Sequence, residues 1–417
     1  MTNRSTRRIL QITADHFPPA IRVVKEGVSL AEAGFSSAVL SPPISDRPEY
    51  EEWRGIRIFR PRVLAGERRF LDRLSLQSVF FSYAWYRAIK EVIAEYQPDV
   101  LHVHDIWLGR TAFLARTNQK IVMDLHENMP AAVVEYLKGY RGLLKLFNFV
   151  FKGASRILSY ERSLLMRSDR VFTVVEEARE RVVCDHPELA NSKVVNIENL
   201  ESKDFIKEKD SGTTVIGKDH FSILYIGGFG THRGIDTLIQ AMVPIKEWKL
   251  NVHVHLVGAQ PSQYLDMLNE LVASLDVSDR VKIKGWVPAD EVLAYIRQAD
   301  VGAVPHHSNP HTDNTIPHKL YQYMIAGIPV LVSTSPPLAR TIRQAYAGGI
   351  FRAGDYMDCA EKIREMYEDR DGMGKCAVNG FRYVMEQGHN WEEESAPSLV
   401  QVYDKLLEKT PSRRVEA

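Results

Sequence analysis

Short apolar runs alternate with longer amphipathic segments along most of the chain. In the first half, this pattern predicts strands at residues 7–13, 36–42, 53–63, 99–105, 120–127, 169–175 and 193–199. A helical pattern follows most of them, and the first helix is expected to end at Gly34, because glycine suits the left-handed conformation after a helix. Strands that alternate with helices indicate βαβ units, and therefore an α/β fold with a doubly wound parallel sheet.

A polar stretch interrupts this alternation, and a second alternation follows it. Residues 206–219 are rich in charged residues and glycine, which predicts a linker between an N-terminal domain over 1–205 and a C-terminal domain over 220–390. In the second half, strands are predicted at 221–228, 250–258, 280–287, 300–306 and 329–334, with helices between them. Ligands of such sheets bind beyond the carboxyl ends of the strands, so the cleft between the domains is the expected site.

The composition excludes several classes of protein. Lysine plus arginine and aspartate plus glutamate both total 53 among 417 residues, whereas a nucleic-acid-binding protein normally has a basic excess. Cys184, Cys359 and Cys376 are far apart, which favours a reducing cytoplasm over a disulfide framework or a zinc site. No run approaches the ~18 apolar residues of a membrane helix, and the N-terminal apolar stretch is too short for a secretory signal.

A glycine-rich loop at 225–241 is the first candidate for chemistry. Gly227, Gly228, Gly230 and Gly234 let backbone amides approach a ligand, and the helix that follows favours an anion at its N-terminus. Arg233 stands where the dinucleotide fingerprint requires glycine, and the Gly-Lys-Ser/Thr of a Walker A loop is absent. The loop therefore predicts a site for a mobile diphosphate, with an ordinary strand–helix turn as the alternative.

The second candidate is the histidine-rich segment 305–333. A helix is expected from Pro317 to Gly327, and its N-terminal amides together with Lys319 would form an anion site facing the first one. The spacing of the neighbouring histidines matches no zinc motif, and no cysteine joins them. Histidines that line a pocket are favoured over a metal site; they are His306, His307, His311 and His318.

Taken together, these segments resemble the retaining glycosyltransferases of family 4. The resemblance extends over essentially the whole chain and rests on ITADHFPP, DVLHVHD, DLHE, SDRVFTVVEEARERV, GGFGTHRGIDTLIQA, KGWVPADEVLAYIRQADVGAVP and KLYQYMIAGIPVL. It implies the GT-B fold, in which two Rossmann-like domains face each other across a cleft. It also implies that a C-terminal helix within 391–417 completes the first domain.

The resemblance assigns residues of the second domain to the nucleotide sugar. The family has a loop of the pattern G-R-x-x-x-x-K-G. In this chain, Gly228 occupies the position of the arginine and Arg233 the position of the lysine. The glutamates of the E-x7-E pair, which touch the donor sugar and the ribose, are replaced by Asn314 and Gln322. Amides still form hydrogen bonds with hydroxyls, but these bonds are weaker than those of a charged carboxylate. Lys319 is expected to supply the positive charge that the missing arginine would provide. Asn314 is thus a catalytic candidate, and the donor-binding candidates are Gly227, Gly228, Arg233, Thr315, Ile316, Lys319 and Gln322.

In the first domain, His126 matches a family histidine near the reacting sugar, with a purely structural hydrogen bond as the alternative. The acceptor-side candidates are Asp15, His16 and Glu127. His102 and His104 alternate along a buried strand and are expected to be structural. Asp369-x-Asp371 imitates the metal-binding motif of other glycosyltransferases, but a solvated loop is favoured.

The resemblance implies metal-independent transfer of a sugar, with retention of configuration, from a nucleotide-diphosphate sugar to a glycan or lipid-linked acceptor. No cofactor is expected beyond this co-substrate. A non-catalytic GT-B protein with a degenerate donor site remains open because of Gly228, Asn314 and Gln322. A sugar-nucleotide 2-epimerase of the same fold is a third interpretation.

Basic and aromatic residues gather in the segment 135–170. Such a segment can rest on anionic lipid, and the family often acts on membrane acceptors. We therefore expect a cytoplasmic protein with peripheral contact to the inner face of the plasma membrane. The alternative is a helix that packs its apolar face inside the first domain.

Overall fold

The computed structural model describes residues 4–18, 20–65, 69–137, 153–207, 216–217 and 219–408. The chain forms two compact units, Met1–Glu198 with Glu394–Ala417 and Asn199–Glu393. The division falls before the predicted boundary at 205, because Asn199 and Glu201 form hydrogen bonds with Ile316 and Gln322 of the second unit. The C-terminal segment is part of the first unit, as the resemblance implies.

The described residues of the first unit form an eight-stranded sheet in the order β3-β4-β2-β1-β5-β6-β7-β8. All neighbouring strands are parallel except β3 and β4. The strands are β1 Arg8–Ile12, β2 Ser36–Leu40, β3 Tyr50–Trp53, β4 Ile56–Phe59, β5 Val100–His104, β6 Lys120–Leu125, β7 Arg170–Thr173 and β8 Val194–Asn196. The prediction of one strand over 53–63 is wrong, because Arg54 and Gly55 both take positive φ angles and form the turn of a hairpin.

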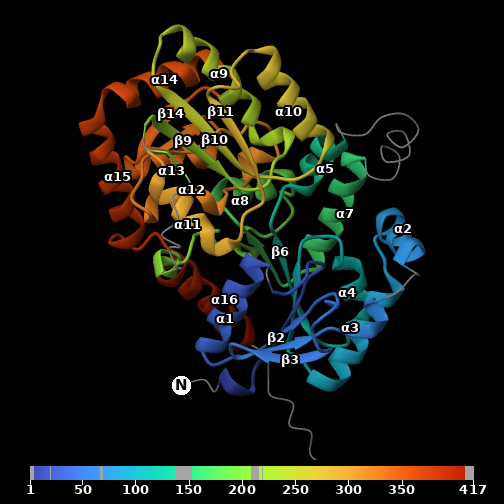
Figure 1. Cartoon of the computed structure of the whole chain (residues 1–417). Coiled ribbons are helices and arrows are strands. Elements are labelled where there is room, and N and C mark those ends of the chain that lie inside the picture. The colour runs from blue at the N-terminus through green and yellow to red at the C-terminus, as the bar shows by residue number, and fades with distance from the viewer. Residues whose placement is uncertain are drawn as a thin grey trace, which may run out of the picture. The chain divides into compact units, whose positions relative to one another are not determined.

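Helices cover this sheet on both faces (Figure 1). They are α1 Ile21–Glu32, α2 Arg69–Val79, α3 Tyr83–Tyr96, α4 Gly109–Ala115, α5 Met129–Leu137, α7 Ala154–Arg167, α8 Glu176–Asp185 and α16 Ala396–Glu408. Helix α16 packs against α1 although the two lie at opposite ends of the chain. Gly34 follows α1 with a φ of 90°, as expected for a glycine after a helix.

The second unit contains a parallel sheet in the order β11-β10-β9-β12-β13-β14 within its described residues. Its strands are β9 Phe221–Ile226, β10 Val252–Ala259, β11 Val281–Gly285, β12 Val301–Val304, β13 Val330–Ser333 and β14 Gly348–Phe351. Its helices are α9 Ile235–Glu247, α10 Gln263–Ser274, α11 Ala289–Gln298, α12 His318–Ile325, α13 Pro336–Ala345, α14 Tyr356–Glu368 and α15 Arg370–Met385. Each predicted strand of this half is present with shifted ends.

Asp369 and Asp371 do not lie in the solvated loop expected for them. The side chain of Asp369 accepts a hydrogen bond of 2.8 Å from the Gly372 N–H and so caps the N-terminus of α15, whose first turn contains Asp371. A carboxylate in this position stabilises the first turn of a helix. These two aspartates therefore stabilise the N-terminus of α15.

Candidate active site

The order of strands in the second unit reverses between β9 and β12, and ligands of open α/β sheets bind at such a switch point. Here the glycine-rich loop after β9 meets the segment after β12. Gly234 has a φ of 66°, and a Cβ at this position would lie 1.9 Å from the carbonyl oxygen of Pro305. The backbone N–H of His307 donates to the His232 carbonyl at 3.1 Å. Only glycine at 234 allows this close approach.

Two cations converge on this loop. Lys319 lies in the first turn of α12, is 8% exposed, and holds its Nζ 3.5 Å from the ring centroid of Tyr225. A Cβ on Gly227 would lie only 2.9 Å from that Nζ, so the glycine makes room for the lysine. Among the described residues, no carboxylate forms an ion pair with Lys319 or with half-buried Arg233. Burial, and then the charge of Arg233, lower the pKa of Lys319 well below its usual value.

Two of the histidines around these cations, His306 and His232, are held in the neutral form. Nε2 of His306 lies 3.3 Å from Nη1 of Arg233, and burial together with that guanidinium lowers the pKa of His306 well below its usual range. Burial and Arg233 likewise lower the pKa of His232 to about 3. His307 is bonded through Nε2 to Asp236 at 3.0 Å. Lys319 and Arg233 are therefore the groups that would meet an anionic ligand here.

The predicted sugar and ribose contacts surround the start of α12. Asn314 is buried, and its Nδ2 donates to the carbonyl oxygen of Pro310 at 2.8 Å. Ile316 is buried as well, and the half-buried Thr315 precedes it. Gly228, by contrast, is exposed, and a Cβ there would meet no atom within 4 Å. A side chain at 228 would therefore start from open space.

Glu201 is a candidate that sequence reasoning missed. Its Oε2 accepts a hydrogen bond of 2.7 Å from Nε2 of Gln322, although the two residues are 121 positions apart. Glu201 is buried, so a carboxylate stands beside the amide that replaces the second glutamate of the motif. This bond uses the amide nitrogen of Gln322, so the amide oxygen can still accept a hydrogen bond from a ligand. Since Glu201 precedes the second alternation within a polar stretch, no sequence pattern marks it.

The first unit has its own switch point, between β1 and β5. Asp15 and His16 follow β1 and are exposed, and the backbone N–H of Asp15 donates to Thr13 Oγ1 at 3.1 Å. His126 and half-buried Glu127 follow β6, the strand beside β5. The structure thus places the four predicted residues at the carboxyl ends of β1 and β6, the two strands that flank β5.

His126 is held by a network of buried groups, and its side chain is 22% exposed. Its Nε2 lies 2.9 Å from Asp124 Oδ2 and 3.0 Å from Nδ1 of His104, and its backbone N–H donates to Asp105 at 3.1 Å. Burial acts to lower the pKa of His126, but Asp105 and Asp124 outweigh it and raise the pKa to about 9. Nδ1, which lies 3.7 Å from Asp105, is the nitrogen left to meet a ligand.

The protonation of His104 agrees with a charged His126. Burial, and then the neighbouring His102, lower the pKa of His104 well below its usual value. Its Nε2 lies 3.0 Å from Oε1 of Gln11, to which it donates. Its Nδ1 lies 3.0 Å from Nε2 of His126 and 3.2 Å from Oδ2 of Asp124. At neutral pH, His126 is therefore an imidazolium whose ring orientation is fixed by its neighbours.

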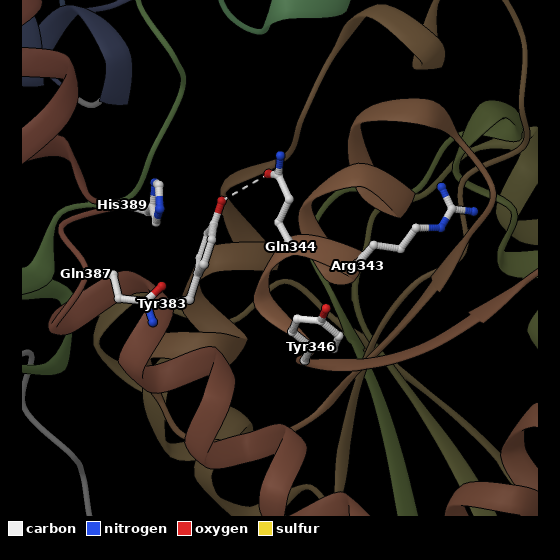
Figure 2. Close-up of a pocket in the computed structure, with 6 residues that line it drawn as sticks. All are labelled: Arg343, Gln344, Tyr346, Tyr383, Gln387 and His389. Atoms are coloured by element: carbon white, nitrogen blue, oxygen red, sulfur yellow. Dashed lines mark hydrogen bonds between the residues drawn. The ribbon is translucent and has the colours of Figure 1, made fainter.

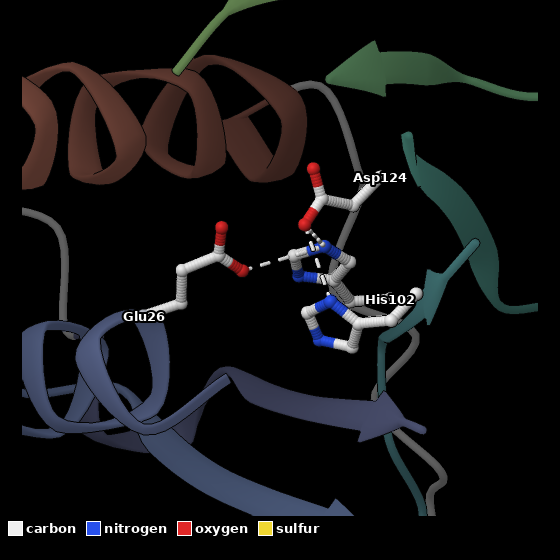
Figure 3. Close-up of side chains that lie close together, drawn as sticks. Glu26, His102 and Asp124 are labelled. Carbon is white, nitrogen blue, oxygen red and sulfur yellow. Dashed lines mark hydrogen bonds and ion pairs between the residues drawn. The ribbon is translucent and has the colours of Figure 1, made fainter. Parts of the chain in front are cut away.

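Close to His126, four buried side chains lie close enough to suggest a metal centre: Glu26, His102, His104 and Asp124. Figure 3 shows Glu26, His102 and Asp124 together. The guanidinium of Arg22 already occupies this position. It donates to both oxygens of Asp124, at 2.8 and 2.9 Å, and its Nη2 lies 3.0 Å from Glu26. Burial acts to raise the pKa of Asp124, but Arg22 and His126 lower it well below its usual value. The cluster is an ion-pair network that supports His126.

His126 is expected to make protein stability depend on pH. Its folded pKa of about 9 lies above its model-peptide value of 6.5, so this contribution is complete below pH 6.5 and is lost as the pH rises through 9. The shift sets an upper limit of about 3 kcal/mol. Urea unfolding at pH 6.5 and pH 10 should show a larger loss for the wild type than for His126→Gln. Equal losses would refute the charged state of His126.

The segment 135–170 is described in part, since residues 138–152 with their four lysines and arginines lie outside the described ranges. Helix α7 buries Ile157, Leu164 and Leu165 in the core of the first unit, and Arg156 donates to the carbonyl oxygen of Ser78. Of the described helices, none is long and apolar enough to cross a membrane. The apolar face of α7 packs against the core of the unit, its other face is exposed, and membrane contact stays a prediction.

Comparison with known families decides the identity of the chain. Residues 20–199 match the glycosyl transferase 4-like domain, and residues 206–382 match glycosyl transferases group 1. The chain belongs to the group 1 glycosyltransferases. The fold class predicted from the sequence, a GT-B architecture of two α/β units with parallel sheets, is confirmed by solved structures of the same fold.

Several relatives of this glycosyltransferase are known. A D-inositol 3-phosphate glycosyltransferase of Thermobispora bispora is 24% identical over 83% of this chain and 80% of its own. The structure of sucrose-phosphate synthase from Thermosynechococcus elongatus has a TM-score of 0.78 at 20% identity, over 97% of this chain and all of the other. HepE of Anabaena, solved in complex with UDP-glucose, has a TM-score of 0.67 at 13% identity, over 97% of this chain and all of the other.

Proposed function

We propose that this group 1 glycosyltransferase moves a sugar from a nucleotide-diphosphate sugar to a glycan or lipid-linked acceptor, with retention of the anomeric configuration and without a metal ion. The observation that carries the proposal is Lys319, a buried cation without a carboxylate partner among the described residues, beside Arg233 at the switch point of the second unit. Burying an unpaired cation opposes folding, so the site suits an anion supplied from outside.

The diphosphate would lie against Lys319, Arg233 and the backbone of Gly227. These groups are fixed before the reaction, and they would stabilise the negative charge that develops on the departing diphosphate. Fixed cations can take the part that a metal ion takes in other transferases. The acceptor hydroxyl would attack from the face of the leaving group, which retains the configuration. The relative solved with UDP-glucose supports a nucleotide sugar as the donor.

The remaining candidates would hold the sugar and the ribose. The oxygen of Gln322, with Glu201 behind its nitrogen, would accept from the ribose hydroxyls, and Asn314 would contact the donor sugar. His126 would supply an imidazolium N–H to the reacting sugar, and Asp15, His16 and Glu127 would border the acceptor. The relative that glycosylates D-inositol 3-phosphate supports a polyol hydroxyl as the attacking group.

The second candidate function is a non-catalytic GT-B protein that binds a nucleotide. Gly228, Asn314 and Gln322 favour it, since the donor site lacks an arginine and two carboxylates of the family motif. Binding of UDP or GDP without turnover of any nucleotide sugar would support this alternative. Consumption of a donor would exclude it.

Replacing Gln322 with glutamate, which restores the family residue, is expected to weaken donor binding about tenfold. In this chain the new carboxylate would face Glu201 across a hydrogen-bond distance, and two close carboxylates in a buried site cannot both ionise. The exchange variant Glu201→Gln/Gln322→Glu keeps one carboxylate and one amide, and it should recover the wild-type KM. Steady-state kinetics at pH 8 with the preferred donor measures both. A single Gln322→Glu variant with unchanged or lower KM would contradict the assignment of Glu201.

A further inference from the structure

The second unit has a surface pocket of about 530 Å³ away from the candidate donor site. Arg343 and Gln344 come from the last turn of α13, Tyr346 from its C-cap and Tyr383 from the last turn of α15. Gln387 and His389 complete the lining (Figure 2). Helix α13 ends where β14 begins, so the pocket lies at the amino ends of the strands. Lys319 and Arg233 lie at the carboxyl ends, which makes this a second site.

Tyr346 lines this pocket in a backbone conformation that is unfavourable for a tyrosine. Its φ of 49° lies in the left-handed region, where glycine is the usual residue after a helix. The tyrosine is 75% exposed, so packing returns little of the strain of that conformation. Its carbonyl accepts from Nδ2 of Asn379 at 3.3 Å, a bond that any residue at 346 would form. The left-handed cap, which Gln97 shares at the end of α3, thus presents the large Tyr346 ring to solvent at the rim of the pocket.

The rest of the lining offers planar polar groups, because Tyr383 is only 8% exposed and presents its hydroxyl edge rather than an open ring face. The hydroxyl of Tyr383 lies 3.3 Å from Oε1 of Gln344, to which it donates across the pocket, and its ring stacks on His389 with centroids 3.9 Å apart (Figure 2). The exposed ring of Tyr346 can attract polarised C–H groups with its negative face, and the amides of Gln344 and Gln387 offer a donor beside an acceptor. A sugar ring presents both counterparts, C–H groups on its faces and hydroxyls at its edge. The volume suits a ligand of one or two sugar rings.

The charge of the pocket argues against an anionic ligand. The last turns of α13 and α15 both end at it, and the carboxyl ends of helices carry partial negative charge. Arg343 is the permanent charge among the six lining residues and offsets this field in part. Helix carbonyls accept hydroxyl protons but repel phosphate. A neutral saccharide therefore fits this pocket better than a nucleotide or a phosphorylated ligand.

We propose that this pocket is a second saccharide-binding site, which holds one or two neutral sugar units of a glycan while the transfer takes place elsewhere in the protein. The saccharide class follows from the lining residues. The origin of the ligand, an acceptor or product chain, rests on the proposed function. Such a site would raise the affinity for long glycans over short ones, because a chain bound at two places gains effective concentration.

Saturation-transfer difference NMR on the full-length protein with maltohexaose, cellohexaose and mannohexaose tests this proposal. At least one hexasaccharide should bind, Tyr346→Phe should bind it equally well, and Tyr346→Gly should bind it at least fivefold more weakly. Because glycine suits the left-handed conformation, Tyr346→Gly should also raise Tm by about 2–4 °C. Loss of binding with a gain of stability cannot come from misfolding.

The outcomes separate this site from the proposed function. Donor turnover without binding of any hexasaccharide at millimolar concentration, or equal binding by wild type and Tyr346→Gly, would overturn the second site and leave the transferase function standing. Binding of a hexasaccharide that depends on Tyr346, without donor turnover, would support the second site and contradict the proposed transferase function. Displacement of the hexasaccharide by UMP or inorganic phosphate would overturn the neutral-saccharide assignment.

Discussion

Replacing Lys319 with methionine is expected to raise the thermal stability of the protein and to lower kcat/KM for the donor about 100-fold. Methionine keeps the length and apolar character of the side chain over Tyr225 and removes a buried cation that opposes folding. The same change removes one of the two cations that face the diphosphate, which costs about 2.7 kcal/mol of transition-state stabilisation at 100-fold. Thermal unfolding and steady-state kinetics measure the two effects.

Exposed Lys375, replaced with methionine, is the matched control, and neither quantity should change. Gly228→Arg, placed in the open space of the loop, should recover part of the activity that Lys319→Met loses. Since the pKa of Lys319 is lowered in the free protein, donor binding should take up a proton and weaken as the pH rises, and Lys319→Met should lack that dependence. Wild-type kinetics in Lys319→Met would contradict the donor site.

Replacing Asp124 with asparagine is expected to destabilise the first unit by about 3–5 kcal/mol and to abolish most of the activity. Asp124 receives two hydrogen bonds from Arg22 in a site closed to solvent, and removing one member of a buried ion pair leaves the other charge uncompensated. The variant also removes a carboxylate that keeps His126 protonated and oriented. Urea unfolding with kinetics on the folded fraction measures both losses.

The double variant Arg22→Met/Asp124→Leu separates the two effects. Apolar residues of similar size can replace a buried ion pair at little cost in stability, but Arg22→Met also leaves buried Glu26 without its cation at 3.0 Å, so the double variant should regain only part of the unfolding free energy. Its activity should stay low, because His126 has lost its partner. Exposed Asp15, changed to asparagine, should shift stability by less than about 0.5 kcal/mol. Recovery of full activity in the double variant would show that Asp124 does not act through His126.

The two sheets could be predicted because most of their inner strands are buried on both faces and therefore form continuous apolar runs. The single strand predicted at 53–63 was wrong because Arg54 and Gly55 reverse the chain between β3 and β4, and the apolar pattern alone does not separate the two short strands of this hairpin. The hydrophobic pattern also places Lys319, Arg233 and His126 at the ends of strands or the starts of helices. Residues in such positions are brought together, because the carboxyl ends of parallel strands meet at one edge of a sheet.

Partners of these residues were not predictable, because they come from distant parts of the chain. Glu201 meets Gln322 across 121 positions, and Arg22 meets Asp124 across 102 positions. Neither pair leaves a periodic signal, since each partner is a single polar residue in an otherwise ordinary segment. His104 was expected to be structural, and the structure adds that its hydrogen bonds support the protonated state of His126.

A screen of nucleotide sugars with the purified protein, followed by proton NMR, tests the transferase assignment most directly. UDP-, GDP- and ADP-linked hexoses are supplied with inositol phosphate, oligosaccharide and lipid-linked acceptors in the presence of EDTA. We expect one donor to be consumed with release of its nucleoside diphosphate, and the new glycosidic bond to keep the anomeric configuration of that donor. Binding of a nucleotide without consumption of any donor, or a product of inverted configuration, would contradict the proposed function.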